Sequence, residues 1–488
     1  MIGRTPALIS VIACCMMMLL LTCKKDKGKL GNGYPEEINK IFTAKCSTPG
    51  CHTKVSKNEA AGLSMETWDE LFQGGSSGAA CIPFSHEYSL LFLFTNTDPA
   101  KGAVNTPTMP YKRPALSDQE MKTLTDWIDN GAPNSDGKIA FADNPNRKKF
   151  YVTNQGCDVV TVFDAATLLE MRYINIGATA QTESPHMLKI SPDGQYWYTC
   201  FSANGTVLEK HRTSDDSYVA QANIGTGSWN TFTISNDSKY AYAVDWTSMT
   251  NNARVVPVDL ATMTALPSWS GIFDYPHGSS ISPKGDTVYI TCNTGNFVYK
   301  VPVNDPGNAA NYSVDPSNSI ATDPAPVEPH DITWLPDSSV YFVTCQKGDY
   351  VSVMARIDDQ CIASIPTGNY PVEMSLSTNP ATPYLFVTCM YDTTDPGNRG
   401  SVTVINYKNF SVLKNIKTNM AEPHGIAVDD ASGLVYVANR NISGPLPHHS
   451  TNCAGKIGFV SFIQLKTLAV LPKTREIAKD PYSVALRK

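Results

Sequence analysis

Tyr151-Val-Thr-Asn154 is the first copy of a four-residue pattern that recurs through the second part of the chain. The later copies are Trp197-Tyr-Thr-Cys200, Tyr242-Ala-Val-Asp245, Tyr289-Ile-Thr-Cys292, Phe342-Val-Thr-Cys345, Phe386-Val-Thr-Cys389 and Tyr436-Val-Ala-Asn439. Successive copies begin 44 to 53 residues apart. A period of this length, carried by short β-rich segments, is typical of the blades of a β-propeller. Seven copies therefore predict seven blades.

The segments around each copy support the same interpretation. Turn sequences such as Ser191-Pro-Asp-Gly194 precede most copies, and a segment such as Asp158-Val-Val-Thr-Val-Phe-Asp164 follows with the alternation expected of a half-buried strand. The C-terminal segment Asp480–Leu486 matches the innermost strand of the other blades, so we expect it to complete the blade that begins near Phe150. This closure would leave no exposed sheet edge. Residues 149–488 closely resemble YVTN-type β-propellers.

A second repeated feature places four histidines after proline at the start of the predicted innermost strands. Because the first two strands of a blade are antiparallel, these histidines should lie at one end of the channel, beside the repeat cysteines. They either bind a metal, a cofactor or an anionic ligand, or each imidazole bonds a neighbouring backbone group and the four are too far apart to share an ion. We expect the cysteines to be small buried residues. The histidines are His186, His277, His330 and His424, the equivalent positions elsewhere are Asn230, Val372 and Tyr482, and the cysteines are Cys200, Cys292, Cys345 and Cys389.

The segment Cys46-Ser-Thr-Pro-Gly-Cys51-His52 carries the other chemical signal of the chain. Two cysteines followed at once by a histidine suit covalent haem attachment, in which the thiols add to the porphyrin vinyl groups and the imidazole ligates the iron. Four residues separate the cysteines here instead of the usual two, so the loop must bulge. A disulfide between Cys46 and Cys51 and a zinc site are the alternatives.

A methionine and a helix complete this pattern. Met109 lies in a proline-stiffened loop and is the predicted sixth iron ligand, ahead of Met65 and of Met121, which falls on the apolar face of a helix predicted after Ser117. Residues 35–134 resemble class I cytochrome c domains in this order of elements, and the resemblance is especially close in the closing helix. It implies a haem c held by Cys46 and Cys51 with His52 and Met109 on the iron. The lone His86 is expected to be a surface or loop residue.

The N-terminus resembles a bacterial lipoprotein signal. A short apolar stretch ends at Leu20-Leu-Thr-Cys23, and the chain then becomes polar. We expect residues 1–22 to be removed, Cys23 to carry the lipid and residues 23–34 to form a flexible tether; cleavage before Cys14 and an uncleaved anchor helix are the alternatives. The protein would then lie in the bacterial cell envelope, lipid-anchored to the outer membrane on its periplasmic or cell-surface side.

The predicted protein is therefore multidomain, with a small all-α cytochrome c domain, a linker at residues 135–148 and an all-β seven-bladed propeller. The net charge of −6 argues against nucleic acid as a partner. We expect an exported c-type cytochrome that transfers electrons, with the propeller binding a redox partner protein or a small-molecule substrate. The alternatives are an oxidoreductase with a second cofactor or metal at the histidine face, and a cell-surface binding protein. Whether the chain is an enzyme stays open.

Overall fold

The computed structural model describes residues 31–321, 327–391, 399–443 and 457–487. The predicted signal peptide, Cys23 and the first residues of the predicted tether lie outside the described residues. His448, His449 and Cys453 also lie outside the described residues. Within the described ranges, no helix combines the length and the apolar character needed to cross a membrane.

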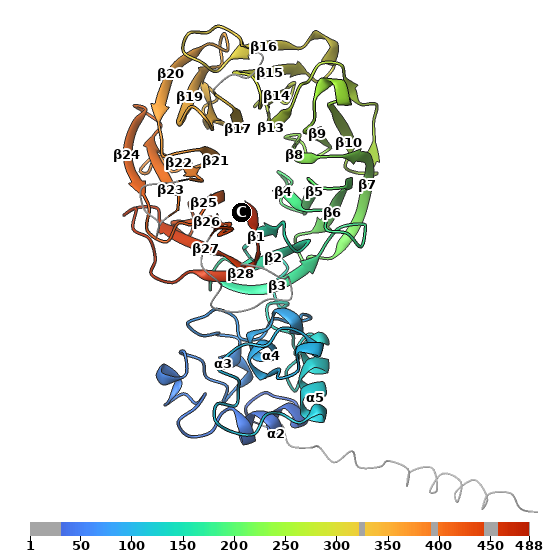
Figure 1. Cartoon of the computed structure of the whole chain (residues 1–488), viewed down its shortest axis with the longest axis vertical. Helices are drawn as coiled ribbons and strands as arrows, with labels where there is room; N and C mark the ends of the chain where they lie inside the picture. Colours follow the sequence, from blue (N-terminus) through green and yellow to red (C-terminus); the bar gives the residue numbers. More distant parts are fainter. Residues whose placement is uncertain (1–30, 322–326, 392–398, 444–456, 488) are drawn as a thin grey trace, which may run out of the picture.

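Residues 31–140 hold four α-helices, and we call them the helical region (Figure 1). Its α-helices are α2 (Glu36–Lys45), α3 (Trp68–Leu71), α4 (Leu90–Thr95) and α5 (Asp118–Asp129), with short 3-10 turns η1 (Lys57–Glu59), η2 (His86–Tyr88) and η3 (Pro99–Lys101) between them. Helix α2 buries Ile38, Ile41 and Phe42, which recur at helical spacing and so share one face. Helix α5 begins with the predicted capping box of Ser117 and Glu120, in which each side chain bonds the other residue's backbone N–H.

Aromatic side chains fix α2 against α5. Phe42 lies edge-on to both Tyr34 and Trp127, with ring centroids 5.0 and 6.0 Å apart. The indole N–H of Trp68 donates to the carbonyl of Ala132 at 2.9 Å, so the segment after α5 is tied to α3. Helix α5 buries Met121, as predicted, together with Leu124, Trp127 and Ile128 on the same face. This core supports the loops that carry the cysteines and Met109.

The rest of the described chain forms seven antiparallel sheets around a central channel, which is a seven-bladed β-propeller (Figure 1). Each of the seven repeated tetrapeptides falls in the second strand of its blade, as predicted. The first three blades are β29 (Pro481–Leu486), β1 (Lys149–Asn154), β2 (Val159–Asp164) and β3 (Leu169–Asn175); β4 (Pro185–Ile190), β5 (Tyr196–Phe201), β6 (Gly205–Arg212) and β7 (Tyr218–Gly227); and β8 (Trp229–Ile234), β9 (Tyr240–Asp245), β10 (Arg254–Asp259), β11 (Thr264–Ala265) and β12 (Trp269–Ser270).

The remaining four blades have four strands each, listed from the channel outward. They are β13 (Pro276–Ile281), β14 (Thr287–Cys292), β15 (Phe297–Pro302) and β16 (Ala310–Ser313); β17 (Pro329–Trp334), β18 (Val340–Cys345), β19 (Tyr350–Ala355) and β20 (Cys361–Pro366); β21 (Pro371–Leu376), β22 (Tyr384–Cys389), β23 (Ser401–Asn406) and β24 (Ser411–Ile416); and β25 (Pro423–Asp429), β26 (Leu434–Asn439), β27 (Ile457–Gln464) and β28 (Arg475–Lys479). Two short 3-10 turns, η4 (Met249–Asn251) and η5 (Pro306–Asn308), lie in loops between strands.

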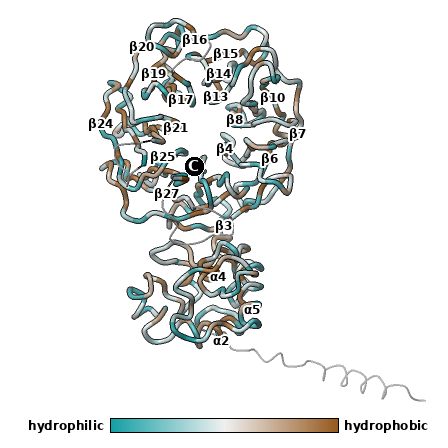
Figure 2. Tube along the Cα trace, viewed as in Figure 1, coloured by the Kyte–Doolittle hydropathy of each residue, from teal (hydrophilic) through white to brown (hydrophobic). Residues whose placement is uncertain are grey.

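The C-terminal strand closes the ring as the sequence predicts. Strand β29 pairs antiparallel with β1 and becomes the innermost strand of the first blade. Across the seam to the last blade, Phe150 stacks on Tyr436 with ring centroids 4.2 Å apart. Apolar clusters of this kind lie between neighbouring blades, and Figure 2 shows hydrophobic residues distributed around the whole ring instead of in one central mass. The two ends of the propeller are thus held by a paired strand and by a packed aromatic seam.

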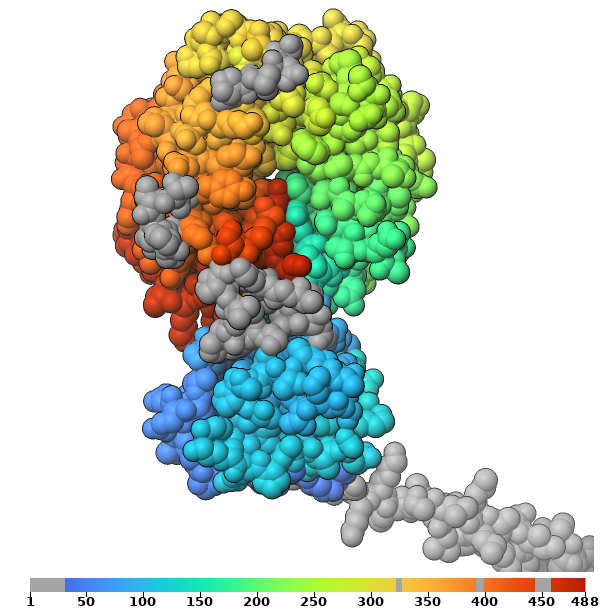
Figure 3. Space-filling view, in the orientation of Figure 1, coloured from blue at the N-terminus to red at the C-terminus, as the bar shows by residue number. Residues whose placement is uncertain are grey.

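The helical region packs against β3, the outer strand of the first blade, and forms a separate lobe beside the ring (Figure 3). Tyr88 stacks on Tyr173 with ring centroids 4.2 Å apart and almost parallel planes. The backbone N–H of Ala79 donates to Glu170 at 3.0 Å, and Arg172 donates to the carbonyl of Ala140 at 3.0 Å. Residues Glu170 and Arg172 are both buried, so this contact excludes water and holds the two parts together.

Candidate functional site

The loop that carries the two cysteines turns back on itself directly after α2. Cys46 is the C-cap residue that follows Lys45, and the backbone N–H of His52 donates to the carbonyl of Cys46 at 3.1 Å. The N–H of Cys51 donates to Thr48 at 2.9 Å, and Gly50 adopts a φ of +80° that favours glycine. The extra residues between the cysteines therefore form a compact turn. Cys46 and Cys51 are both free thiols in this structure, so the disulfide alternative does not describe it.

His52 is held in one orientation by the backbone. Its Nδ1 lies 3.3 Å from the carbonyl oxygen of Leu63, and its own carbonyl accepts from the N–H of Met65 at 2.9 Å. Burial lowers the pKa of the imidazole, which keeps the ring neutral near pH 7. A neutral imidazole whose Nδ1–H is bonded to a carbonyl presents Nε2 as a lone-pair donor. That is the arrangement common among metal-ligating histidines.

Met109 comes from a separate segment that follows α4. The N–H of Met109 donates to the carbonyl of Phe94 at 2.7 Å, and the N–H of Asn105 donates to Leu93 at 3.0 Å. These two bonds dock the proline-rich loop on the end of the helix. The loop therefore places the Met109 side chain in a defined position.

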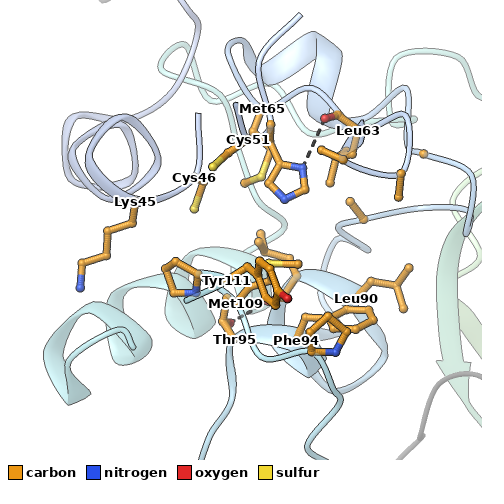
Figure 4. A pocket seen from close by; sticks show the side chains of 18 of the residues that line it. Lys45, Cys46, Cys51, Leu63, Met65, Leu90, Phe94, Thr95, Met109 and Tyr111 are labelled. Atoms are coloured by element: carbon orange, nitrogen blue, oxygen red, sulfur yellow. Dashed lines mark hydrogen bonds between the residues drawn. The ribbon is translucent and has the colours of Figure 1, made fainter. Parts of the chain in front are cut away.

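A single cavity of about 480 Å³ is lined by Cys46, Cys51, His52 and Met109. Figure 4 shows Cys46, Cys51 and Met65 on one wall and Met109, Thr95 and Phe94 on the opposite wall. The two sets come from segments that are distant in sequence. The thiols and the imidazole thus face a thioether across a shared space.

The lining of the cavity fits a haem group. Most of it is apolar, and Leu63, Leu90, Leu91, Phe94 and Pro107 contribute to the walls. Two thiols, one neutral imidazole and one thioether form the donor set that covalent haem with two axial protein ligands requires. The cations Lys45 and Arg113 also line the cavity and suit the carboxylates of such a group, although the Lys45 ammonium already lies 2.8 Å from Glu120.

The positions of the other candidate ligands separate them from Met109. Met65 lies on the wall that carries the cysteines, so it does not face the imidazole from the opposite side (Figure 4). Met121 packs in the core of the helical region. His86 lies in η2 and is half-buried, and its Nδ1 is 2.8 Å from Asp129 Oδ1. It does not line the cavity. Of the three methionines considered, Met109 is therefore the one placed to oppose His52.

The four histidines of the propeller come together at the centre of the ring. Each is the second residue of its innermost strand, after a proline, in β4, β13, β17 and β25. Consecutive ring centroids are 5.9 Å apart for His186–His277, 4.1 Å for His277–His330 and 5.6 Å for His330–His424. Tyr482 closes the circle, 3.6 Å from His424 and 4.1 Å from His186. We call these five residues the histidine circle.

The histidine circle is buried, and several of its nitrogen atoms have no partner among the described residues. The four imidazoles are 1 to 7% exposed. Within the described part of the chain, His186 Nε2, His330 Nδ1 and His424 Nδ1 make no hydrogen bond. His277 Nδ1 lies 3.4 Å from the carbonyl of His330, so backbone bonding, one of the two interpretations left open by the sequence, applies to that residue.

Burial governs the charge of the circle. It lowers the pKa of His277 to about 4, and it holds the pKa values of His186, His330 and His424 well below the ordinary value. The four imidazoles are therefore neutral at pH 7. Four neutral imidazoles in contact offer lone pairs to a cation or N–H groups to an acceptor.

Two acidic side chains that were not predicted from the sequence, Glu373 and Asp331, lie beside the circle. Glu373 follows Val372 in β21, and its Oε1 is 3.6 Å from His424 Nδ1. Burial is the main reason that the pKa of Glu373 lies well above its ordinary value, and the nearby Asp331 raises this pKa further. Asp331 directly follows His330, and Glu373 directly follows Val372, which occupies the position equivalent to the histidines in its blade. That repeat register, read one residue further, is the signal that would have found them.

The repeat cysteines are buried and free, as predicted. Three of them pair in register with the proline at the start of the innermost strand of their blade: Cys292 with Pro276, Cys345 with Pro329 and Cys389 with Pro371. Burial raises the pKa of the Cys345 thiol to about 12. These thiols are therefore protonated at neutral pH and belong to the apolar packing of the blades.

The comparisons with known proteins agree with the propeller and go no further. The chain matches no protein-family profile, and no curated protein matches it in sequence. A functionally unknown protein from Desulfotomaculum acetoxidans has a similar structure, at 14% identity, with 69% of this chain and 98% of that chain covered and a TM-score of 0.51. A putative 6-phosphogluconolactonase from Bacteroides uniformis has 13% identity, 70% and 99% coverage and a TM-score of 0.51.

Hydrazine synthase of Kuenenia stuttgartiensis is also similar, at 14% identity, with 63% of this chain and 90% of that chain covered and a TM-score of 0.45. At such identities, likeness in structure is evidence for the fold alone. The chemistry of this chain must be inferred from its own residues.

Proposed function

We propose that this protein is a c-type cytochrome that transfers electrons through one covalently bound haem. The observation that carries the proposal is the convergence of Cys46, Cys51, His52 and Met109 on a single apolar cavity from two separate segments. In this proposal residues 35–134 form a class I-like cytochrome c domain. Bound haem would supply a one-electron iron couple with both axial positions filled, which suits electron transfer over oxygen chemistry.

The residues of the chain have distinct tasks in this proposal. Cys46 and Cys51 would hold the group covalently, and the carbonyl of Leu63 would keep His52 in the tautomer that presents Nε2. The apolar walls would exclude water. The docking of the Met109 loop on Phe94 would fix the sulfur and so reduce the reorganisation that accompanies each change of charge.

The location and partners of the protein are part of the same proposal. A signal peptide at residues 1–22 and a lipid at Cys23 would place the chain in the bacterial cell envelope, where haem is attached to exported cytochromes. The propeller would then bind a redox partner protein or a small-molecule substrate. The buried histidine circle favours a second candidate function, an oxidoreductase with an additional cofactor or metal in the propeller channel. A binding protein of the cell surface is the third.

The axial role of Met109 can be tested with a matched pair of methionine variants. We expect Met109→Leu to open the sixth iron position, so that the reduced protein binds carbon monoxide, and to lower the reduction potential by a measurable part of the roughly 0.8 V range that axial ligands span. Met65→Leu, at a residue lining the same cavity, should change neither property, since this swap conserves volume. Redox titration and absorbance spectra make the comparison.

The opposite pattern would contradict the assignment. If the reduced Met65→Leu protein bound carbon monoxide and the Met109→Leu protein did not, Met65 would be the iron ligand. The position of Met109 on the opposite wall of the cavity would then be irrelevant to ligation. If neither variant changed the spectrum of a protein that contains haem, the sixth ligand would lie elsewhere in the chain.

A further inference from the structure

The histidine circle has the character of a cation site that lies apart from the haem cavity. Its members come from five different blades, whereas the cavity belongs to the helical region beside the ring (Figure 1). The four imidazoles are at least nine-tenths buried, and three of them have a nitrogen that makes no hydrogen bond among the described residues. A buried polar atom of this kind ordinarily has a bound partner. Repetition over four blades makes such an arrangement a feature of the fold.

Two imidazoles already have their second nitrogen engaged. His277 Nδ1 is 3.4 Å from the carbonyl of His330, and His186 Nδ1 is 2.7 Å from the side-chain amide of Gln155. The oxygen and nitrogen of that amide can be exchanged by a flip, which would give His186 Nδ1 an acceptor. In both residues Nε2 is then the atom left for the channel. Metal-ligating histidines are commonly oriented by this kind of contact.

Two carboxyl groups beside the circle could assist the binding of a cation. Glu373 contacts His424, and Asp331 is close enough to raise the pKa of Glu373 further. A divalent cation would favour the ionised forms of these two carboxyl groups and would relieve the cost of burying them. Two cations lie near the circle. Lys189 is half-buried, and desolvation lowers its pKa. Arg440 lies 4.9 Å from the ring centroid of Tyr482 and is paired with Asp480 at 2.6 Å.

We propose that His186, His277, His330 and His424 form a binding site for one divalent transition-metal ion in the propeller channel. Imidazole is a preferred ligand of Cu²⁺, Zn²⁺ and Ni²⁺, and the order of affinities makes Cu²⁺ the most sensitive probe. The arrangement is open in this structure, because among the described residues only His86, Glu87 and Asp129 bring three ligand atoms within 4.8 Å of one another. Binding therefore requires rotation of imidazoles. In the described ranges His330 Nδ1 and His424 Nδ1 make no hydrogen bond that such a rotation would break, and His424 Nδ1 has a 3.6 Å contact with Glu373.

The test is a titration of the full-length, chelator-treated holoprotein with Cu²⁺, followed by electron paramagnetic resonance. We expect one Cu²⁺ per chain with splitting from at least two imidazole nitrogens. The double variant His277→Asn/His330→Asn should bind Cu²⁺ at least 100-fold more weakly. Asparagine is the replacement because Asn230 occupies the equivalent position of a neighbouring blade, so the scaffold accepts it. Circular dichroism of the variant checks that the propeller remains folded.

The control variant His86→Asn disrupts the cluster of His86, Glu87 and Asp129, which could hold a metal ion in the described part of the chain, and should bind Cu²⁺ as the unchanged protein does. The proposal is overturned if Cu²⁺ shows no imidazole coupling, if the double variant binds as tightly as the unchanged protein, or if His86→Asn abolishes binding. If the double variant does not fold, the single variant His330→Asn is tested in the same way. The haem spectrum is recorded on every sample, so a colourless protein that binds copper would contradict the proposed electron transfer and leave this site standing.

Discussion

A chain in which Cys46 and Cys51 are both replaced by alanine is expected to contain at least ten-fold less covalently bound haem than the unchanged protein. Both thiols line the cavity, and the covalent bonds of a c-type haem are made by cysteine sulfur. Without them, haem could only be held by the iron ligands and should be removed by acid extraction. Single replacements should leave one attachment and an intermediate yield. Intact mass after denaturation, with haem staining of the denatured chain, measures the outcome.

The matched control for this pair is Cys81→Ala. Cys81 is fully buried in the core of the same helical region, but it does not line the cavity. Its replacement removes a small buried side chain and should leave the covalent haem content unchanged. Covalent haem that persists in the double variant, or that is lost in Cys81→Ala at normal folded yield, would contradict the assignment of Cys46 and Cys51.

The second large effect is expected at the junction of the first two blades. Lys149 at the start of β1 lies 2.8 Å from Asp216, which is in the loop between β6 and β7, and both side chains are only 2% exposed. Tyr151 donates to the other carboxylate oxygen of Asp216 at 2.9 Å. Asp216→Ala would leave a buried ammonium without its counter-charge, at a cost of about 3–5 kcal/mol. We expect a correspondingly lower midpoint in urea denaturation followed by circular dichroism.

The neighbouring aspartate provides the control. Asp215 is exposed, and its side chain bonds only locally with Ser217. Asp215→Ala should change the stability by less than about 1 kcal/mol. Equal effects of the two replacements would show that the buried pair does not stabilise the blade junction. The same device recurs between two later blades, where Asp359 lies 2.6 Å from Lys300 and accepts from Tyr289 and Tyr341.

Local patterns in the sequence were sufficient to predict the propeller. The tetrapeptide repeat gave the number of blades, and the register of residues 480–486 gave the closing strand. One expectation was wrong in detail: β2 was predicted to be half-buried, yet all six of its residues are buried. A blade is covered on both faces by its neighbours, so alternation of polar and apolar residues does not imply an exposed face.

The contacts between distant segments were beyond prediction from the sequence. The repeat placed the four histidines at one end of the channel, but it left open whether they touch, because that depends on how far each side chain reaches inward. The pairing of Lys149 with Asp216 joins a strand to a loop of the next blade and leaves no periodic signal. The docking of the helical region through Glu170 and Tyr173 likewise depends on residues that read as ordinary strand positions.

The helical region was predictable where local rules apply. The helix predicted after Ser117, with Met121 on its apolar face, follows from spacing and side-chain chemistry and is confirmed as α5. The choice between Met109 and Met65 needed the structure, because both residues line the cavity and only the walls on which they lie distinguish them.

The most direct test of the account is a pyridine haemochrome spectrum of the full-length protein, produced with haem-maturation machinery, together with its intact mass. The account predicts the bands of a haem with two thioether bonds and a mass increased by one haem per chain. A colourless protein, or a chain whose mass includes no haem, would contradict it. The cavity between Cys46, Cys51 and Met109 would then need another occupant.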